Sequence, residues 1–251
     1  MLAAAGSVDH DQIVELAGQY ASPRSLSLAR APSPPPRLPD PPGPSAPRVN
    51  FLIKDTEQYH VCLGGPAIAR DDERRFALRL LDNILGGTSS SRLFQEVRER
   101  RGLAYSIFSF TGLYAGTGQV GIYLGTRPDN LAESLRIVGA ELERFVGDPA
   151  TEEELVRSRE NVKGRTVLSL ESTSTRMNRL GSALLADMPI LSLDEVIDRI
   201  DAVALDDLRE LAATLFDPAR LSAAGIGPDE QAFRASLEPV SAHLPAAEGP
   251  G

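Results

Sequence analysis

The sequence predicts an α+β fold, in which a layered antiparallel or mixed sheet packs against helices. Strand-like apolar runs come first, at residues 50–55 and 58–65. Two more runs, at residues 104–114 and 119–126, are joined by a short turn and predict a hairpin. From Pro128 onward, apolar residues recur at steps of three and four, which predicts helices. Strands grouped ahead of helices, with a hairpin between, are typical of an α+β layer.

The composition favours a globular protein with no nucleic-acid or membrane partner. Apolar residues make up 42% of the 251 residues, and the formal net charge of −9 opposes a phosphate-binding surface. No run approaches the roughly 20 apolar residues that span a bilayer, and the N-terminus resembles no secretory signal. Cys62 is the single cysteine. We expect it to be a buried small hydrophobe, and a lone thiol indicates a reducing, cytoplasmic compartment.

The chain divides into four segments. Residues 1–21 predict a strand end, LAAAG, and a helix capped by Asp9 or Asp11. One strand and one helix cannot form a core, so this piece is expected to dock on the later domain or on something outside the chain. Residues 22–49 contain ten prolines and are predicted to be a linker. The apolar stripe of the first helix consists of Ile13, Leu16, Ala17 and Tyr20.

Residues 50–228 are predicted to form the main domain, and residues 229–251 a weakly structured tail that consists of a weak helix and a loose end. After the first two strands, a helix from about Asp71 stops at the Gly86-Gly87 pair, and the next helix ends at Gly102.

Later in this domain, two capping boxes begin helices, TEEE at Thr151 and SLDE at Ser192. Leucines 205, 208, 211 and 215 stripe the last long helix, and the run RLSAAGIG is expected to return to the sheet as its final strand.

Motifs for cofactors and catalysis fail on context. GTGQVG, at residues 116–121, matches a dinucleotide-binding pattern, but a strand follows it where a helix is needed, which indicates a hairpin turn. The histidines, His10, His60 and His243, form no His-x-x-Glu-His pair, and no Gly-x-Ser-x-Gly elbow exists. The chain is therefore predicted to hold no catalytic residue and to bind no metal or other cofactor.

Arg98 and Tyr105 are the candidate site residues. A helix that ends at Gly102 and reverses into a strand places its last turn beside the first residues of that strand. An arginine fork and a phenol there would converge on a carbonyl or an oxyanion. A structural role for each is also open, because a cation suits the last turn of a helix and aromatic strand residues are usually core. Arg100 and Arg101 are expected to be solvated surface.

Three segments carry a resemblance to a known family: LIKDTEQYHVCLGGPA, LLDNILGGTSSSRLFQEVRERRGLAYSIFSF and the long helix after GTRPDN. They resemble the C-terminal half of insulinase/pitrilysin-type zinc metallopeptidases, which include mitochondrial processing peptidase and its bacterial relatives. The resemblance covers residues 50–228. AAAGSVDHDQIVELA also resembles the strand and helix that close the first domain of that family, so residues 1–21 are expected to be a remnant of an N-terminal, catalytic-type domain.

The resemblance implies a layered domain that occurs twice in a clamshell, with the peptide substrate between the halves. It implies that zinc, held by His-x-x-Glu-His and a later Glu, belongs to the N-terminal half. The C-terminal half contributes an Arg and a Tyr to substrate binding, and these fall on Arg98 and Tyr105. A peptide or unfolded protein is then the expected substrate. The expected partner is a zinc-bearing half or a homologous subunit, which makes a dimer.

Three functions remain open at this stage. The chain is either the substrate-binding part of a zinc endopeptidase, inactive alone, or a non-catalytic subunit that binds peptides or a partner without chemistry. A decayed fragment without function is the third.

Overall fold

A five-stranded mixed sheet organises the domain. The computed structural model describes residues 2–21 and 46–246. The β1 and β5 strands are parallel, and the other three neighbouring pairs are antiparallel. This sheet and its helices confirm the predicted α+β class, the β3–β4 hairpin and the final strand. In sheet order the strands are β1 (Val49–Ile53), β5 (Ser222–Gly227), β2 (Tyr59–Ala67), β4 (Thr117–Thr126) and β3 (Ala104–Tyr114).

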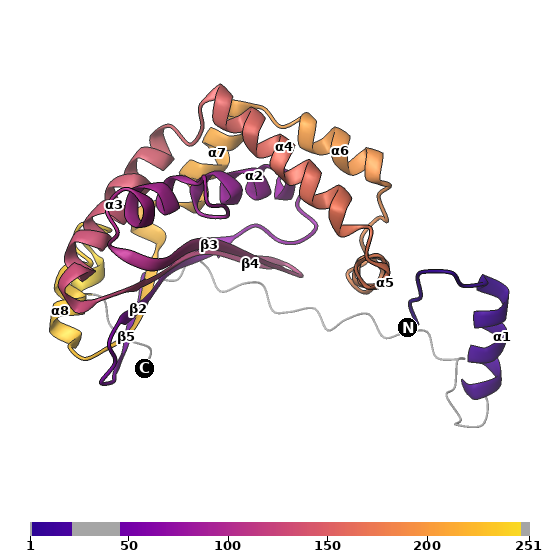
Figure 1. Cartoon of the computed structure of the whole chain (residues 1–251), viewed down its shortest axis with the longest axis horizontal. Helices are drawn as coiled ribbons and strands as arrows, with labels where there is room; N and C mark the ends of the chain where they lie inside the picture. Colours follow the sequence, from indigo (N-terminus) through magenta and orange to yellow (C-terminus); the bar gives the residue numbers. More distant parts are fainter. Residues whose placement is uncertain (1, 22–45, 247–251) are drawn as a thin grey trace.

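Helices α2, α3, α4, α6 and α7 arch over one face of this sheet (Figure 1). Both predicted capping boxes form: Thr151 caps α4 with Glu154, and Ser192 caps α6 with Glu195. The helix before β3 contains a π-helical segment, η2 (Phe94–Glu99). The α-helices are α1 (His10–Ala21), α2 (Arg75–Leu85), α3 (Leu131–Gly147), α4 (Glu152–Ser169), α5 (Thr173–Leu185), α6 (Leu193–Asp201), α7 (Leu205–Leu215) and α8 (Glu230–Ser236). Short 3-10 turns lie at Pro128–Asn130, Pro218–Arg220 and Leu244–Ala246.

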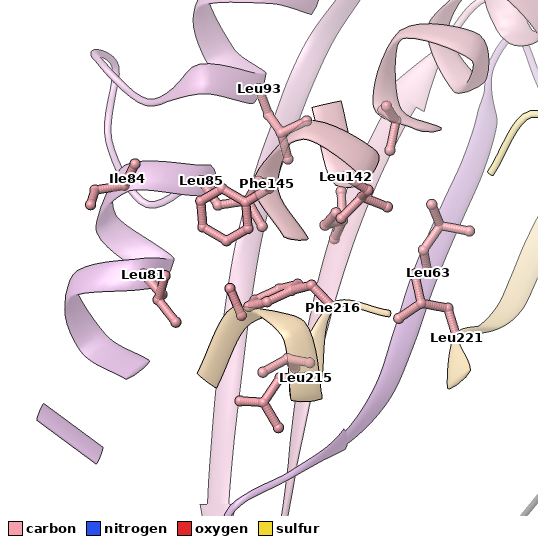
Figure 2. Packing of buried hydrophobic residues seen from close by; sticks show 14 of the residues in the cluster. Leu63, Leu81, Ile84, Leu85, Leu93, Leu142, Phe145, Leu215, Phe216 and Leu221 are labelled. Atoms are coloured by element: carbon pink, nitrogen blue, oxygen red, sulfur yellow. The ribbon is translucent and has the colours of Figure 1, made fainter. Parts of the chain in front are cut away.

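The core lies between the sheet and the helices, because alternate strand residues face the apolar stripes of α2, α3 and α7. Figure 2 shows leucines of α2 and α3 meeting Phe145 and Phe216, whose rings stand edge to face with centroids 5.3 Å apart. In β2, Leu63 points into the same cluster. Burial of these large side chains is the main source of stability for the domain.

The N-terminal strand prediction is wrong. Residues 2–5 are not a strand, because within the described residues no strand pairs with them. The α1 helix forms as predicted, and the Asp9 carboxylate accepts the Gln12 amide at 2.8 Å. Its apolar stripe stays uncovered, however, and Tyr20 is 76% exposed. The described part of the main domain therefore does not provide the docking surface that this helix needs.

The helix expected after Pro228 forms as α8, but the prediction that residues 229–246 are weakly structured is wrong, because they pack into the core. Asp229 caps α8 through the Ala232 amide at 3.0 Å, and α8 packs against α3. The apolar residues recur at steps of four, three and four, a helical period that fills the core. They are Phe233, Leu237, Val240 and Leu244, all at most 3% exposed. Of the predicted linker, residues 22–45 lie outside the described residues, as do residues 247–251 of the tail.

An ion pair between Arg92 and Glu154 holds the start of the helix before β3. The Arg92 guanidinium donates to both Glu154 carboxylate oxygens, at 2.9 and 2.7 Å, and to the Asp148 carbonyl at 2.9 Å. Glu154 also accepts the Thr151 amide in the capping box of α4. Burial acts to raise the pKa of Glu154, but the bonds from Arg92 and Thr151 outweigh it and lower the pKa from 4.5 to about 2.

The end of the same helix depends on Gly102, whose φ is +62°. The Gly102 amide bonds the Arg98 carbonyl at 3.0 Å, and the Leu103 amide bonds the Val97 carbonyl at 3.0 Å. A left-handed residue here lets the chain reverse directly into β3.

Glu154→Gln is expected to lower the free energy of unfolding by about 3 kcal/mol at pH 7, since a carboxylate with a depressed pKa stabilises the folded state above its unfolded pKa. The difference from the parent chain should shrink as the pH falls below 4.5 toward 2. Urea unfolding at pH 7, 4 and 3 measures it. Glu133→Gln, in the exposed pair with Arg136, is the control and should leave the midpoint nearly unchanged. A pH-independent difference would contradict the assignment.

Gly102→Ala is expected to destabilise the domain by about 1–2 kcal/mol, because a side chain is strained in the left-handed region. Gly164→Ala is the matched control: Gly164 lies within α4 with open space around a new Cβ, and Ala should stabilise that helix by up to about 1 kcal/mol. Equal effects of the two substitutions in denaturant unfolding would show that the turn at Gly102 is not constrained.

Candidate substrate-binding site

The reversal at Gly102 brings Arg98 and Tyr105 together, as the sequence predicts. The guanidinium carbon of Arg98 lies 5.0 Å from the centroid of the Tyr105 ring and 4.8 Å from that of Phe94. These are cation–π distances, so the two aromatic rings hold the cation without using its hydrogen-bond donors.

Tyr105 is not a core residue, which removes the structural alternative for it. The pairing register of β3 with β4 shifts between Ala104, opposite Thr126, and Ser106, opposite Gly125. Tyr105 is the extra residue of this bulge and is 78% exposed. Bulges re-aim side chains in this way at the rims of sites.

Arg98 is loosely engaged by its neighbours. In the described structure its one ion pair is with Glu99, at 3.9 Å, and its side chain is 37% exposed. Arg100 and Arg101, by contrast, both pair with Glu96 and are exposed surface, as expected. The donors of the Arg98 guanidinium are therefore available to a ligand.

Both side chains border an open cavity of about 360 Å³, lined also by Gln58, Gly125 and Arg127. A guanidinium and a phenol at one cavity can donate hydrogen bonds to the same carbonyl oxygen or to a developing oxyanion.

The uncovered face of the sheet next to this site carries aromatic and histidine side chains that no motif of the sequence predicts. Phe108 stacks on Tyr123 with centroids 5.0 Å apart, and the Tyr123 hydroxyl is 2.7 Å from Nδ1 of His60. From the sequence, His60 is a candidate only for metal binding. The period-two alternation of β2 and β3 was the signal that places these residues outside the core.

Cys62 belongs to the same face, so the prediction that it is buried is wrong. It alternates with the inward-facing Val61 and Leu63 and is exposed, although partial desolvation raises the pKa of its thiol.

Within residues 2–21 and 46–246, no three His, Cys, Asp or Glu side chains are grouped so as to hold a metal ion. A zinc ion needs such a group of nitrogen, sulfur and carboxylate ligands, so the described residues do not fit it. No described helix has the length and apolar character to cross a membrane.

A family model described as the peptidase M16 inactive domain matches residues 1–162. An uncharacterized zinc protease of Streptomyces coelicolor is 41% identical over 243 residues, which are 93% of this chain and 51% of that protein. The uncharacterized zinc protease YmxG of Bacillus subtilis is 42% identical over 163 residues, 65% of this chain and 40% of that protein. The chain thus spans about half the length of the first of these relatives.

Solved structures show the same fold. A protease from Helicobacter pylori aligns with a TM-score of 0.79 at 24% identity, over 89% of this chain and 54% of that one. A peptidase M16 inactive domain from Pseudomonas fluorescens aligns with a TM-score of 0.75 at 22% identity, over 89% and 52% of the two chains. Because the family model matches more than half of this chain, the chain belongs to the M16 peptidases and is an inactive domain of that family.

Proposed function

We propose that this chain is the C-terminal, substrate-binding half of a zinc-dependent endopeptidase. The observation that carries the proposal is the convergence of Arg98 and Tyr105 on one open cavity, in a domain whose relatives are named zinc proteases. We assign the zinc ion and the water that it activates to a partner half, because the described residues of this chain do not fit a metal.

In this proposal Arg98 and Tyr105 act as hydrogen-bond donors to the peptide. Their position at the end of a pinned helix and on a bulge orients both donors before the peptide arrives. Pre-oriented donors are effective when they stabilise charge that develops in the transition state.

An internal repeat supports the assignment of residues 1–21 to a second domain of the same fold. LAAAG at residues 2–6 matches LSAAG at residues 221–225, which includes most of β5. In both copies an aspartate follows, Asp9 before α1 and Asp229 before α8. Its carboxylate accepts a hydrogen bond from the backbone amide three residues later and so caps the helix.

The apolar positions that follow the two capping aspartates also correspond. Counted from the capping aspartate, Ile13, Ala17 and Tyr20 of the first copy fall on the core residues of the second, Phe233, Leu237 and Val240. The exposed stripe of α1 is therefore of the kind that fills a core beside a sheet. We infer that residues 2–21 complete a neighbouring domain built like this one.

Arg98→Ala and Tyr105→Phe, each placed in an enzyme reconstituted from this chain and a zinc-bearing half, should lower peptide turnover by about 10²–10³, since each removes one donor to the oxyanion. Hydrolysis of an unstructured fluorogenic peptide measures it. Arg100→Ala is the matched control, because Arg100 lies two residues away on the surface and pairs with Glu96; its turnover should be unchanged.

Unchanged turnover in both site variants would contradict the assignment of these residues. If this chain binds peptide but gives no turnover with any zinc-bearing half, a non-catalytic peptide-binding subunit would be favoured instead.

Removal of residues 1–21 should change the free energy of unfolding of the domain by no more than about 0.5 kcal/mol relative to the full chain, because none of their described side chains is buried. Phe233→Ala, in the corresponding helix of this domain, should cost about 3–5 kcal/mol, since it empties a fully buried site against Phe51. Denaturant unfolding measures both. A large loss on removing residues 1–21 would mean that they belong to this domain after all.

A further inference from the structure

A second cleft lies away from the Arg98–Tyr105 cavity, among α2, the far end of β3, the C-terminal end of α4 and α5 (Figure 1). It consists of two adjoining cavities of about 760 and 360 Å³ that share Arg79, Asp82 and Ser169 in their walls. We call it the α2–α5 cleft.

The α2–α5 cleft is cationic, although the protein as a whole carries a net charge of −9. Among the described residues that line it, Asp82 is the single carboxylate. The cations are Arg70, Arg75, Arg79, Arg165 and Arg179.

Three of these arginines are occupied by the protein itself. Arg70 donates to the Leu113 carbonyl at 3.1 and 2.9 Å, Arg75 pairs with Glu73, and Arg179 donates to the Leu191 carbonyl. They shape the walls of the cleft and have fewer donors left for a ligand.

Arg79 and Arg165 are different, because in the described structure neither makes a hydrogen bond or an ion pair. Desolvation and the positive charge of Arg165 lower the pKa of Arg79. Asp82 is a poor counter-ion, since its Oδ1 accepts the Ser109 hydroxyl at 2.6 Å and its burial raises its pKa. Both arginine side chains are exposed at the mouth of the cleft, and Asp82, which attracts Arg165, is the one carboxylate beside them. Two guanidinium groups that repel each other and share a single weak counter-ion form a site that an anion would stabilise.

The wall next to this pair is apolar. Phe76, Leu78 and Leu113 line the larger cavity from one side, and Met188 and Ile190 line it from the loop after α5. Ile190 is exposed. A small inorganic anion would leave this surface in water, whereas a ligand with a carboxylate and an apolar body would cover both parts. The larger cavity has a volume typical of sites for such ligands.

We infer that the α2–α5 cleft is a second peptide anchor. Arg79 and Arg165 bind a carboxylate of the peptide, and the loop after α5 covers the apolar side chains of the peptide next to that carboxylate. The inference rests on the proposed function in taking the ligand to be a peptide. Tyr105 and Leu113 stand eight residues apart on β3, about 26 Å at the rise of an extended strand. One peptide that contacts both sites therefore needs at least about eight extended residues.

Fluorescence anisotropy with the full 251-residue chain tests this. The probe is a fluorescein-labelled flexible peptide whose last residues alternate Glu and Leu, compared with its Gln and Leu counterpart. The Glu peptide should bind with the lower Kd, and Arg79→Gln with Arg165→Gln should raise that Kd at least about tenfold. Ile190→Ser, at an exposed position, should weaken binding several-fold through the apolar wall alone.

Arg136→Gln and Arg209→Gln remove arginines that lie outside the cleft and should leave the Kd unchanged. Because neither Arg79 nor Arg165 makes a hydrogen bond or an ion pair in the described structure, and both side chains are exposed, the variant should unfold close to the parent midpoint. Arg98→Ala with Tyr105→Phe should keep the affinity of the cleft, so failure of the proposed catalytic role and failure of this anchor are distinguishable.

Three results would overturn the anchor: no binding of the Glu peptide, equal binding of the Glu and Gln peptides, or unchanged affinity in the double arginine variant. Displacement of the peptide by inorganic phosphate at a concentration near the peptide's own Kd would also overturn it, because the apolar wall would then contribute nothing.

Discussion

The Arg98–Tyr105 site depends on a short helix that is fixed at both ends. At its start, Arg92 ties it to Glu154 and to the carbonyl that ends α3. Just beyond its end, the Thr126 hydroxyl and the side-chain amide of Asn130 both donate to the Leu103 carbonyl, at 2.7 and 3.1 Å. The π-helical segment between these points widens the helix at the position from which the Arg98 side chain projects. Two long side chains can meet reproducibly only because the backbone between them has little freedom.

The fold was predictable from the sequence wherever a local pattern and a tertiary contact agree. The hairpin, both capping boxes and the leucine stripe of α7 follow from spacing alone. The tail was mispredicted because α8 is only seven residues long, and its helical period becomes clear only when Leu237, Val240 and Leu244 are counted with it. Residues 2–5 have a strand sequence but no described partner strand, which no local pattern can reveal.

The candidate site was partly predictable. The helix stop at Gly102 predicts that Arg98 lies beside Tyr105, and the Arg98 guanidinium carbon does lie 5.0 Å from the centroid of the Tyr105 ring. The bulge that turns Tyr105 outward depends on how β3 pairs with β4, so no local pattern predicts it. The α2–α5 cleft was unforeseen for the same reason: Arg79 and Arg165 are far apart in the chain, and only the packing of α2 on α4 brings their charges together.

The place of β5 has a consequence for how the domain forms. This strand lies between β1 and β2, and it pairs residue 49 with residue 223. Before β5 is made, β1 therefore has no partner strand in the described sheet and β2 is unpaired along one edge, until nearly the whole domain has left the ribosome. Such non-local pairing slows folding and leaves aggregation-prone edges exposed in the interim. A nascent chain with this topology has reason to need a chaperone until its last strand is inserted.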